Sequence, residues 1–269
     1  MPNDLQRAND AMVWLVGSGP GGVDDLTIRA ARLIEQADVI LHDALVTDDI
    51  LALAGKETRM IPVGKRGHRG AVPQDFTNHL MVSLAKTGQR VVRLKGGDPS
   101  VYGRAQEERE FLEEHGVDVR VAPGVTTASA AAAQFGFSLT ERETARRVMF
   151  ATGRTLNGPQ TEWRMAADKQ TTLCLYMACA DISDISKLLI DAGRDASTPA
   201  LITWNVGRQD SGAVQTCLKD LPSKTSHVAK GAPVFIVIGE ATAQAKTQNL
   251  APAVQPALKD NKQLGAPGK

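Results

Sequence analysis

The chain has 269 residues, 42% hydrophobic and 23% charged, which is enough for one large domain or two of ordinary size with substantial cores. A formal net charge of +1 excludes a general nucleic-acid binder, and no apolar run approaches the roughly 20 residues of a membrane span. Three cysteines without a paired spacing predict buried thiols in a reducing, cytoplasmic compartment, and the polar N-terminus is not a signal peptide.

The chain begins with a short apolar strand, residues 13–16, that runs into a glycine loop over residues 17–22. We expect a helix led by Asp24 and Asp25, because the following apolar residues recur at helical spacing: Leu26, Ala30, Leu33, Ile34 and Ala37. The loop is similar to a dinucleotide fingerprint, but Pro20 interrupts it and two leading acids would repel a pyrophosphate. We interpret it as a tight loop that shapes a cleft, with a nucleotide-dependent dehydrogenase as the weaker alternative.

The next two strands lead to a basic loop. Residues 39–41 predict a strand that runs on to Asp43, residues 48–54 a helix, and residues 59–63 a third strand. The loop over residues 64–70 follows, with three permanent cations and a histidine between glycines. Ligands in open α/β sheets bind beyond the carboxyl ends of strands, so the loop is either an anion site or a solvated basic loop.

The stretch of residues 90–99 organises the chain. It opens as a strand and breaks at Gly96-Gly97-Asp98-Pro99. Glycine has no Cβ, so a ligand can approach bare backbone at this turn, and Asp98 adds a carboxylate for a cationic or hydroxyl-bearing ligand. From these residues alone, a plain turn without a ligand is the alternative.

The remaining elements predict two α/β domains. Helices are expected over residues 73–86 and 102–115, and the alternation of strands and helices up to residue 121 predicts a mainly parallel sheet. Strands expected in the second half predict a mixed sheet: residues 147–151, 172–177, 200–204 and 234–238. The expected organisation is a flexible N-terminus and two domains followed by a disordered tail: residues 1–12, 13–122, 123–246 and 247–269.

Four motifs occur in order, followed by Tyr176-Met177: Val16-Gly17-Ser18-Gly19-Pro20-Gly21, Val63-Gly64-Lys65-Arg66, Arg93-Leu94-Lys95-Gly96-Gly97-Asp98-Pro99 and Pro123-Gly124-Val125-Thr126. This ordered set resembles the tetrapyrrole methyltransferases over roughly residues 13–240. The resemblance implies the two-domain tetrapyrrole methylase fold (class III methyltransferases), with a parallel N-terminal sheet, a mixed C-terminal sheet and S-adenosylmethionine in the interdomain cleft. It also implies S-adenosylhomocysteine as product, a homodimer, a small tetrapyrrole substrate, and no metal, nucleic-acid or membrane partner.

Within the family, the motifs are most similar to those of members that act on uroporphyrinogen III. The implied reaction is C-methylation at C2 and C7, giving precorrin-2 through precorrin-1, in porphyrin, cobalamin or sirohaem biosynthesis. A related methyltransferase of corrinoid precursors is the alternative, and a non-catalytic binding protein is disfavoured by Asp43, Lys65 and Arg104. Nothing similar to a dehydrogenase or chelatase module precedes residue 13, so we expect the stand-alone form.

The resemblance also assigns residues. The family's acid/base positions match Asp43 and Lys65, and Arg104 is a third catalytic candidate. The cofactor contacts fall on these residues: Pro20, Gly96, Gly97, Asp98, Val101, Thr126, Thr127, Met177 and Val206. Substrate contacts match Arg104, Glu107 and Arg142, and the carboxylate-rich substrate needs cations, for which the candidates are Lys65, Arg66, Arg104, Arg142, Arg146 and Arg147.

The chain departs from the family pattern at three places. His42 stands before Asp43 where the family commonly has tyrosine, and Glu141 stands where it has histidine. The segment from Tyr102 to Ala105 replaces a phenylalanine and a glycine on either side of a kept Gly103-Arg104 pair. Because the acid and the arginines are kept, these changes affect the expected packing of the substrate and not the expected reaction.

Overall fold

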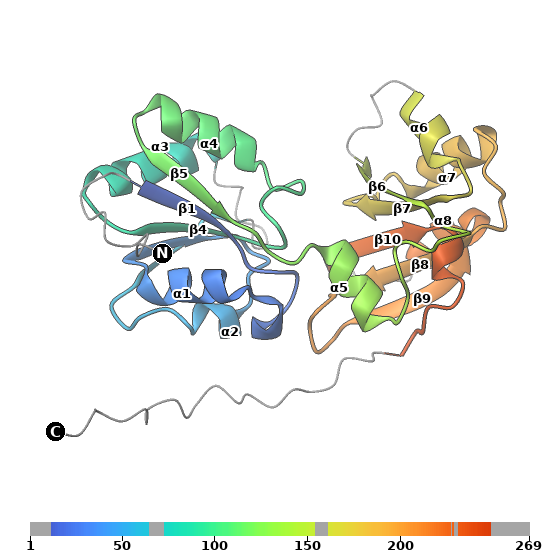
Figure 1. Ribbon diagram of the computed structural model, residues 1–269, viewed down its shortest axis with the longest axis horizontal. Coiled ribbons are helices and arrows are strands. Elements are labelled where there is room, and N and C mark those ends of the chain that lie inside the picture. The colour runs from blue at the N-terminus through green and yellow to red at the C-terminus, as the bar shows by residue number, and fades with distance from the viewer. Residues whose placement is uncertain (1–11, 65–72, 154–160, 227, 229–230, 249–269) are drawn as a thin grey trace.

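The described part of the chain forms two α/β domains, joined by the segment that leads from β5 (Asp118–Ala122) to α5 (Thr127–Gln134) (Figure 1). The computed structural model describes residues 12–64, 73–153, 161–226, 228 and 231–248. Apart from residues 12, 247 and 248, the predicted flexible N-terminus and disordered tail lie outside this part of the chain. None of the helices within it has the length and apolar character needed to cross a membrane.

The N-terminal domain contains a five-stranded sheet in the order β3-β2-β4-β1-β5. Every neighbouring pair is parallel, which confirms the predicted parallel sheet. The strands preceding β5 are β1 (Met12–Gly17), β2 (Val39–His42), β3 (Arg59–Pro62) and β4 (Val91–Lys95). Since β4 lies between β1 and β2, its carboxyl end is at the centre of the edge where ligands of parallel sheets bind.

Helices cover both faces of this sheet (Figure 1). One face carries α1 (Ile28–Gln36) and α2 (Asp48–Leu51), and the other carries α3 (Gln74–Lys86) and α4 (Ala105–Glu114). Side chains alternate along β4, so Val92 packs with Ile34 of α1 while Val91 packs beneath α3 and α4. The same alternation places Arg93 and Lys95 on the α3–α4 side.

Two helices begin later than the sequence predicts. The first helix starts at Ile28, where Thr27 accepts a hydrogen bond from the Ala30 backbone N–H at 3.1 Å. The two acids thought to lead it lie in a separate 3₁₀ turn, Val23–Asp25. The helix α4 starts at Ala105 and not at residue 102, because Tyr102 (φ 52°) and Arg104 (φ 58°) are left-handed.

The C-terminal domain contains a second sheet in the order β6-β7-β10-β8-β9. Its strands are β6 (Arg147–Thr152), β7 (Thr171–Tyr176), β8 (Pro199–Trp204), β9 (Gly212–Cys217) and β10 (Val234–Ile238). Only β6 and β7 pair in parallel, which confirms the predicted mixed sheet. The edge strand β9 was not predicted, because glycine, glutamine and threonine interrupt its apolar pattern.

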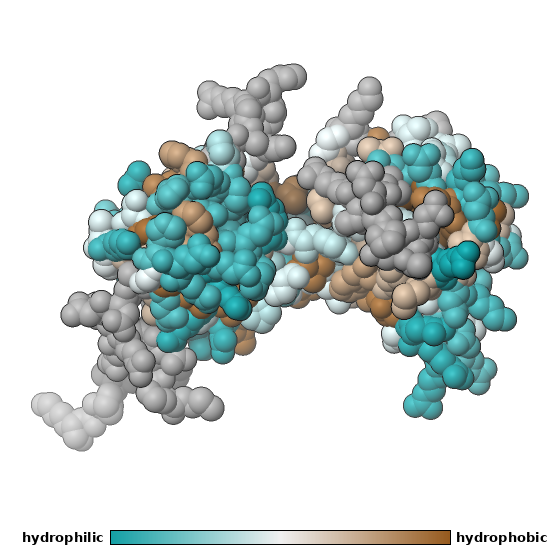
Figure 2. All heavy atoms as spheres, turned by 90° about the horizontal axis from the view of Figure 1, so that it is seen from above, coloured by the Kyte–Doolittle hydropathy of each residue, from teal (hydrophilic) through white to brown (hydrophobic). Residues whose placement is uncertain are grey.

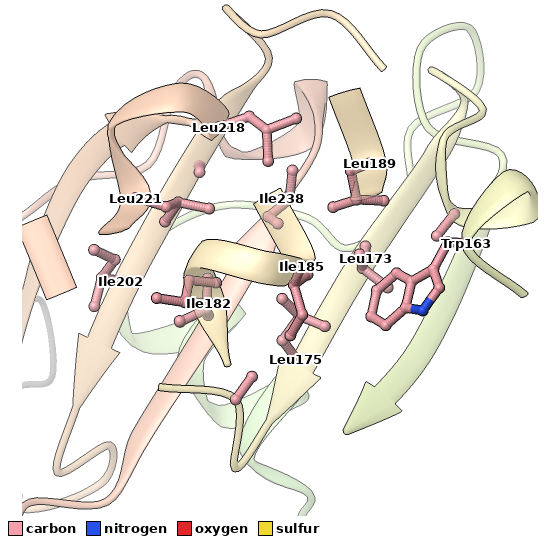
Figure 3. Packing of buried hydrophobic residues seen from close by; sticks show 14 residues of the cluster. Trp163, Leu173, Leu175, Ile182, Ile185, Leu189, Ile202, Leu218, Leu221 and Ile238 are labelled. Carbon is pink, nitrogen blue, oxygen red and sulfur yellow. The ribbon is translucent and has the colours of Figure 1, made fainter. Parts of the chain in front are cut away.

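The core of the C-terminal domain lies between this sheet and three helices (Figure 3). These helices are α6 (Thr161–Ala166), α7 (Ile182–Asp191) and α8 (Leu221–Thr225), and short 3₁₀ turns occur at Leu218–Asp220 and Glu240–Thr242. Leu173 and Leu175 of β7 meet Ile185 of α7, and burying each side chain contributes about 1.5–3 kcal/mol. The alanine-rich α5 covers the opposite face, where small side chains allow close packing.

We expect Asp38→Asn to lower the free energy of unfolding at pH 7 by about 0.5–1 kcal/mol, a small value because both partners are partly exposed. Asp38 precedes β2 and accepts hydrogen bonds from Arg90, which precedes β4: from the backbone N at 2.7 Å, Nε at 3.1 Å and Nη2 at 2.6 Å. Hydrogen bonds from the Arg90 side chain lower the pKa of Asp38. Urea unfolding at several pH values measures the effect.

The pH dependence of this difference has a definite sign. The carboxylate's contribution is fully present above its unfolded-state pKa of about 3.9 and is lost as pH falls through the lower folded-state pKa. The difference between wild type and Asp38→Asn should therefore disappear in acid. A difference that stays constant down to the lowest measurable pH would contradict the assignment to this carboxylate.

Candidate active site

A cavity of about 550 Å³ lies between the two domains. Figure 2 shows the domains as separate lobes with hydrophobic side chains gathered between them. The N-terminal domain contributes Asp43, Leu45 and Lys95 to the wall, and the C-terminal domain contributes Tyr176 and Phe235. The nine residues predicted to contact a cofactor all line it as well: Pro20, Gly96, Gly97, Asp98, Val101, Thr126, Thr127, Met177 and Val206.

The floor of the cavity forms where three loops touch through their backbones. Gly19 and Gly97 exchange backbone hydrogen bonds of 2.7 and 3.2 Å, which ties the loop after β1 to the loop after β4. A Cβ on Gly124 would lie 2.2 Å from the Gly97 carbonyl oxygen, and one on Gly17 would lie 2.6 Å from Gly124. Glycine is therefore required at this junction, and the glycine loop shapes the cleft as the sequence predicts.

Asp98 holds two of these loops together. One carboxylate oxygen accepts the Ser100 backbone N–H at 2.7 Å and the other accepts that of Gly124 at 3.0 Å. Next to it, Gly97 has φ 71°, and a Cβ built on it would meet no protein atom within 4 Å. The floor thus combines a pinned carboxylate with bare backbone beneath open space, which suits close approach of a ligand.

The two domains also meet at one rim of the cavity. Arg208 donates from Nη2 to the Leu45 carbonyl oxygen at 2.8 Å, and the Gly22 backbone N–H donates to the Gly207 carbonyl oxygen at 3.2 Å. A Cβ on Gly21 would lie 2.1 Å from that same Gly207 oxygen. Direct contact of backbone with backbone therefore sets the spacing of the domains on this side.

Left-handed residues other than glycine concentrate around the cavity. Tyr102 and Met177 both line it, each with φ 52°, and Asn205, with φ 51°, precedes the lining residue Val206. Such conformations cost on the order of 1–3 kcal/mol each and are found where the surrounding structure requires them. Their position is typical of a functional site.

Tyr176 links the cavity wall to the start of α5, and we expect Tyr176→Phe to lower the free energy of unfolding by about 1–3 kcal/mol. Its hydroxyl pairs with Thr126 Oγ1 at 2.7 Å and accepts a hydrogen bond from the Ala128 backbone N–H at 3.3 Å. The substitution removes the hydroxyl and leaves this N–H without its partner. Burial raises the pKa of Tyr176 to about 12, so the hydroxyl stays protonated at neutral pH. Urea unfolding of Tyr176→Phe, Thr126→Val and the double variant gives the coupling energy. Strictly additive losses would contradict the pairing.

A group of buried charges stands behind one wall of the cavity. Asp43 lines the cavity with about 30% of its side chain exposed, and its Oδ1 accepts a hydrogen bond from Arg93 Nη2 at 2.5 Å. Arg93 and Lys95 are about 5% exposed, and both pair with Glu108, which is fully buried. The sequence did not single out Arg93, Lys95 or Glu108 as site residues. The sequence feature that could have identified the two cations is their position at alternate residues of a buried strand.

The remaining predicted site residues lie elsewhere. Arg104 and Glu107 form an exposed ion pair of 2.6 Å, which lowers the pKa of Glu107, and they are not among the described residues that line the cavity. Arg104 directly follows the lining residues Tyr102 and Gly103. Arg142 is exposed and its carbonyl oxygen accepts a hydrogen bond from Arg146 Nε at 3.0 Å. Two further candidates lie outside the described residues: Lys65 and Arg66.

The parallel and mixed sheets, the glycine floor and the acid in the cavity wall are typical of a two-domain α/β enzyme with its ligand site at the domain junction. The sequence model of the Tetrapyrrole (Corrin/Porphyrin) Methylases matches residues 12–222. The chain therefore belongs to the tetrapyrrole methylase family.

Individual relatives fit this family. The chain is 42% identical to a siroheme synthase of Pseudomonas putida (strain W619) over 229 residues, which are 85% of this chain and 49% of the relative. The siroheme synthase of Chromobacterium violaceum is 41% identical over 230 residues, again 85% of this chain and 49% of the relative. The chain thus spans about half the length of the curated relatives it matches.

Solved structures with this fold align with most of the chain. Uroporphyrin-III C-methyl transferase from Thermus thermophilus, complexed with S-adenyl homocysteine, has a TM-score of 0.72 and 34% identity, covering 86% of this chain and 98% of that one. A cobalt precorrin-4 methyltransferase has a TM-score of 0.76 and 28% identity, covering 89% and 99%.

Proposed function

We propose that this protein transfers methyl groups from S-adenosylmethionine to C2 and C7 of uroporphyrinogen III, giving precorrin-2 through precorrin-1. The observation that carries the proposal is the single cavity that joins the nine predicted cofactor residues to the Asp43 carboxylate. The similar uroporphyrin-III C-methyl transferase, which is complexed with S-adenyl homocysteine, supports the choice of cofactor and substrate.

The residues of the cavity fit the cofactor. A volume of about 550 Å³ lies within the 300–1,000 Å³ typical of small-molecule sites. The bare backbone of Gly96 and Gly97 would hold the methionine end, and at Gly97 open space lies where a Cβ would stand. Thr126, Thr127 and the backbone of Val206 would hold the remainder from the C-terminal domain.

When bound, S-adenosylmethionine supplies a methyl group on a positively charged sulfur, and its transfer leaves neutral S-adenosylhomocysteine. The pyrrole carbons of uroporphyrinogen III are already nucleophilic, so the protein needs no covalent intermediate. The task of the chain is to hold the reacting atoms in line and to exclude water, which two closely packed domains achieve. A carbon–carbon bond forms as the sulfur–carbon bond breaks.

Methylation leaves the tetrapyrrole with a positive charge that is removed by loss of a ring proton. Asp43 is the proposed acceptor of that proton, because its carboxylate lines the cavity and Arg93 holds it in one orientation. Arg104, next in the chain to the cavity wall, would exchange Glu107 for a substrate carboxylate, a geometry that a guanidinium binds well. Lys65, Arg66 and Arg142 are retained as further substrate contacts.

A homodimer and a cytoplasmic location are also part of this proposal. The location is supported by the three cysteines of the chain, since Cys174, Cys179 and Cys217 are all free thiols in the structure. The dimer rests on the family, and sedimentation of the purified chain tests it.

One assay tests the reaction. The purified chain is incubated anaerobically with uroporphyrinogen III and S-adenosylmethionine, and the product is analysed by mass and absorbance. A mass gain of two methyl groups supports the proposal, and no methyl gain contradicts it. Because the fold is also similar to a cobalt precorrin-4 methyltransferase, a corrinoid precursor is the second substrate to test. Methyl gain on that substrate alone would replace uroporphyrinogen III with a corrinoid.

A further inference from the structure

Two cations lie inside the N-terminal domain, on the α3–α4 face of the central strand. Val91 packs into the core beneath these helices, and alternation along β4 places Arg93 and Lys95 on the same face. Each of the two basic side chains is about 5% exposed. Charges this deep need buried counter-charges, because an unpaired charge inside a protein is costly.

Glu108 of α4 supplies one counter-charge to both cations. Its side chain is fully buried, and each of its oxygens accepts a hydrogen bond of 2.8 Å from Lys95 Nζ. Arg93 Nε lies 3.3 Å from Oε1, and Gln74 Nε2 donates to the same oxygen at 2.9 Å. One carboxylate therefore fixes two residues of β4 and the first residue of α3.

Arg93 transmits this constraint to the cavity. While its Nε faces Glu108, its Nη2 donates to Asp43 Oδ1. The two cations and the two carboxylates balance in charge, so the removal of one leaves an uncompensated charge among the others. Glu108 does not line the cavity itself, and it reaches the cavity only through its partners.

We propose that Glu108 is a positioning residue, whose buried carboxylate fixes Arg93 and Lys95 so that Arg93 holds Asp43 in its orientation for proton transfer. The inference rests on the proposed function, in which Asp43 accepts the proton. If Lys95 lost its charge, Glu108 would compete with Asp43 for Arg93. If Glu108 lost its charge, Arg93 would be held loosely. Asp43 would then lose its fixed orientation, and misplacement by about 1 Å costs about 10²-fold in rate.

The protonation of Lys95 reports on this network. Burial lowers the pKa of Lys95 and the neighbouring Arg93 lowers it further, whereas Glu108 and Asp43 raise it. His42, at the end of β2, lies beside the group and contacts the Asp43 carbonyl oxygen at 3.2 Å. Without the Glu108 charge, one of the two raising influences is gone, so Lys95 should lose its proton at a lower pH.

The test compares Glu108→Gln, which keeps the side-chain shape without the charge, with Glu113→Gln, an exposed partner of Arg109 on the same helix. In Glu108→Gln, kcat should fall about 10²-fold, and the affinity for S-adenosylhomocysteine should not change. The alkaline limb of the profile of kcat against pH should move to lower pH. NMR of the Lys95 Cε, in protein without ligand, should show the same direction of change. Glu113→Gln should match wild type in each measurement.

A second variant keeps the test decisive if Glu108→Gln does not fold. Glu108→Asp retains the charge with a shorter reach, and we expect an intermediate kcat with Lys95 titrating close to wild type. Wild-type kcat in Glu108→Gln, whatever the Lys95 titration, or unchanged kcat in Glu108→Asp, would overturn the proposal. If wild type itself fails to methylate uroporphyrinogen III, the proposed function is contradicted, and with it the positioning role in that reaction. The NMR titration still decides whether Glu108 holds Lys95.

Discussion

Asp43→Asn should lower kcat for methyl transfer about 10²- to 10⁴-fold, the usual contribution of a positioned general base. The amide oxygen can still accept the hydrogen bond from Arg93 Nη2, so the wall of the cavity keeps its shape while the proton acceptor is lost. Cofactor affinity should not change, because the predicted cofactor contacts lie on other loops. The anaerobic methylation assay gives kcat, and calorimetry with S-adenosylhomocysteine gives the affinity.

Asp191→Asn, an exposed change at the end of α7, is a matched control and should retain full activity. Two outcomes would contradict the role of Asp43. Full kcat in Asp43→Asn would show that another group takes the proton, with Lys65 in its neutral form as the next candidate. An equal loss of kcat and of cofactor affinity would show that the carboxylate organises the cavity as a whole and is not specific to proton transfer.

The N-terminal sheet could be predicted from the sequence because local pattern determines it. Each apolar strand is followed by an amphipathic helix, and that alternation leaves a parallel sheet as the main solution. The start of α4 could not be predicted, because Tyr102 and Arg104 adopt left-handed conformations that their residue types disfavour. Tyr102 lines the cavity, and its ring lies 5.2 Å from that of Tyr176 between centroids. A contact between segments this far apart in the chain is not visible in a local window.

The nine cofactor candidates came from the resemblance to the family, and the structure brings them to one cavity. The buried charges were missed for a different reason. Of two adjacent acids, Glu107 was chosen, yet it is exposed, whereas Glu108 is buried together with Leu112 four residues later. The spacing of Ala105, Glu108 and Leu112 marks one helix face, so the helical period contained the signal that would have identified Glu108.

Gly124→Ala should weaken binding of S-adenosylhomocysteine about tenfold, or ~1.4 kcal/mol, and lower the free energy of unfolding by about 1–3 kcal/mol. The new Cβ would stand 2.2 Å from the Gly97 carbonyl oxygen and 2.9 Å from the Gly17 Cα. Both obstacles are backbone atoms, so no side chain can rotate away and the segment of Gly124 has to move away from the backbones of Gly17 and Gly97. Calorimetry and urea unfolding measure the two effects.

Gly55→Ala is the appropriate control, because its Cβ would meet the nearest atoms at 3.2 and 3.3 Å, far from the cavity, and small shifts accommodate that contact. The pattern of loss tests the argument further. Asp98→Ala removes the carboxylate that accepts a hydrogen bond from the Gly124 backbone N–H and adds no atom, so it should weaken the same binding without the steric strain. If Gly124→Ala binds S-adenosylhomocysteine as wild type does, the junction of three glycine loops is not the floor of the cofactor site.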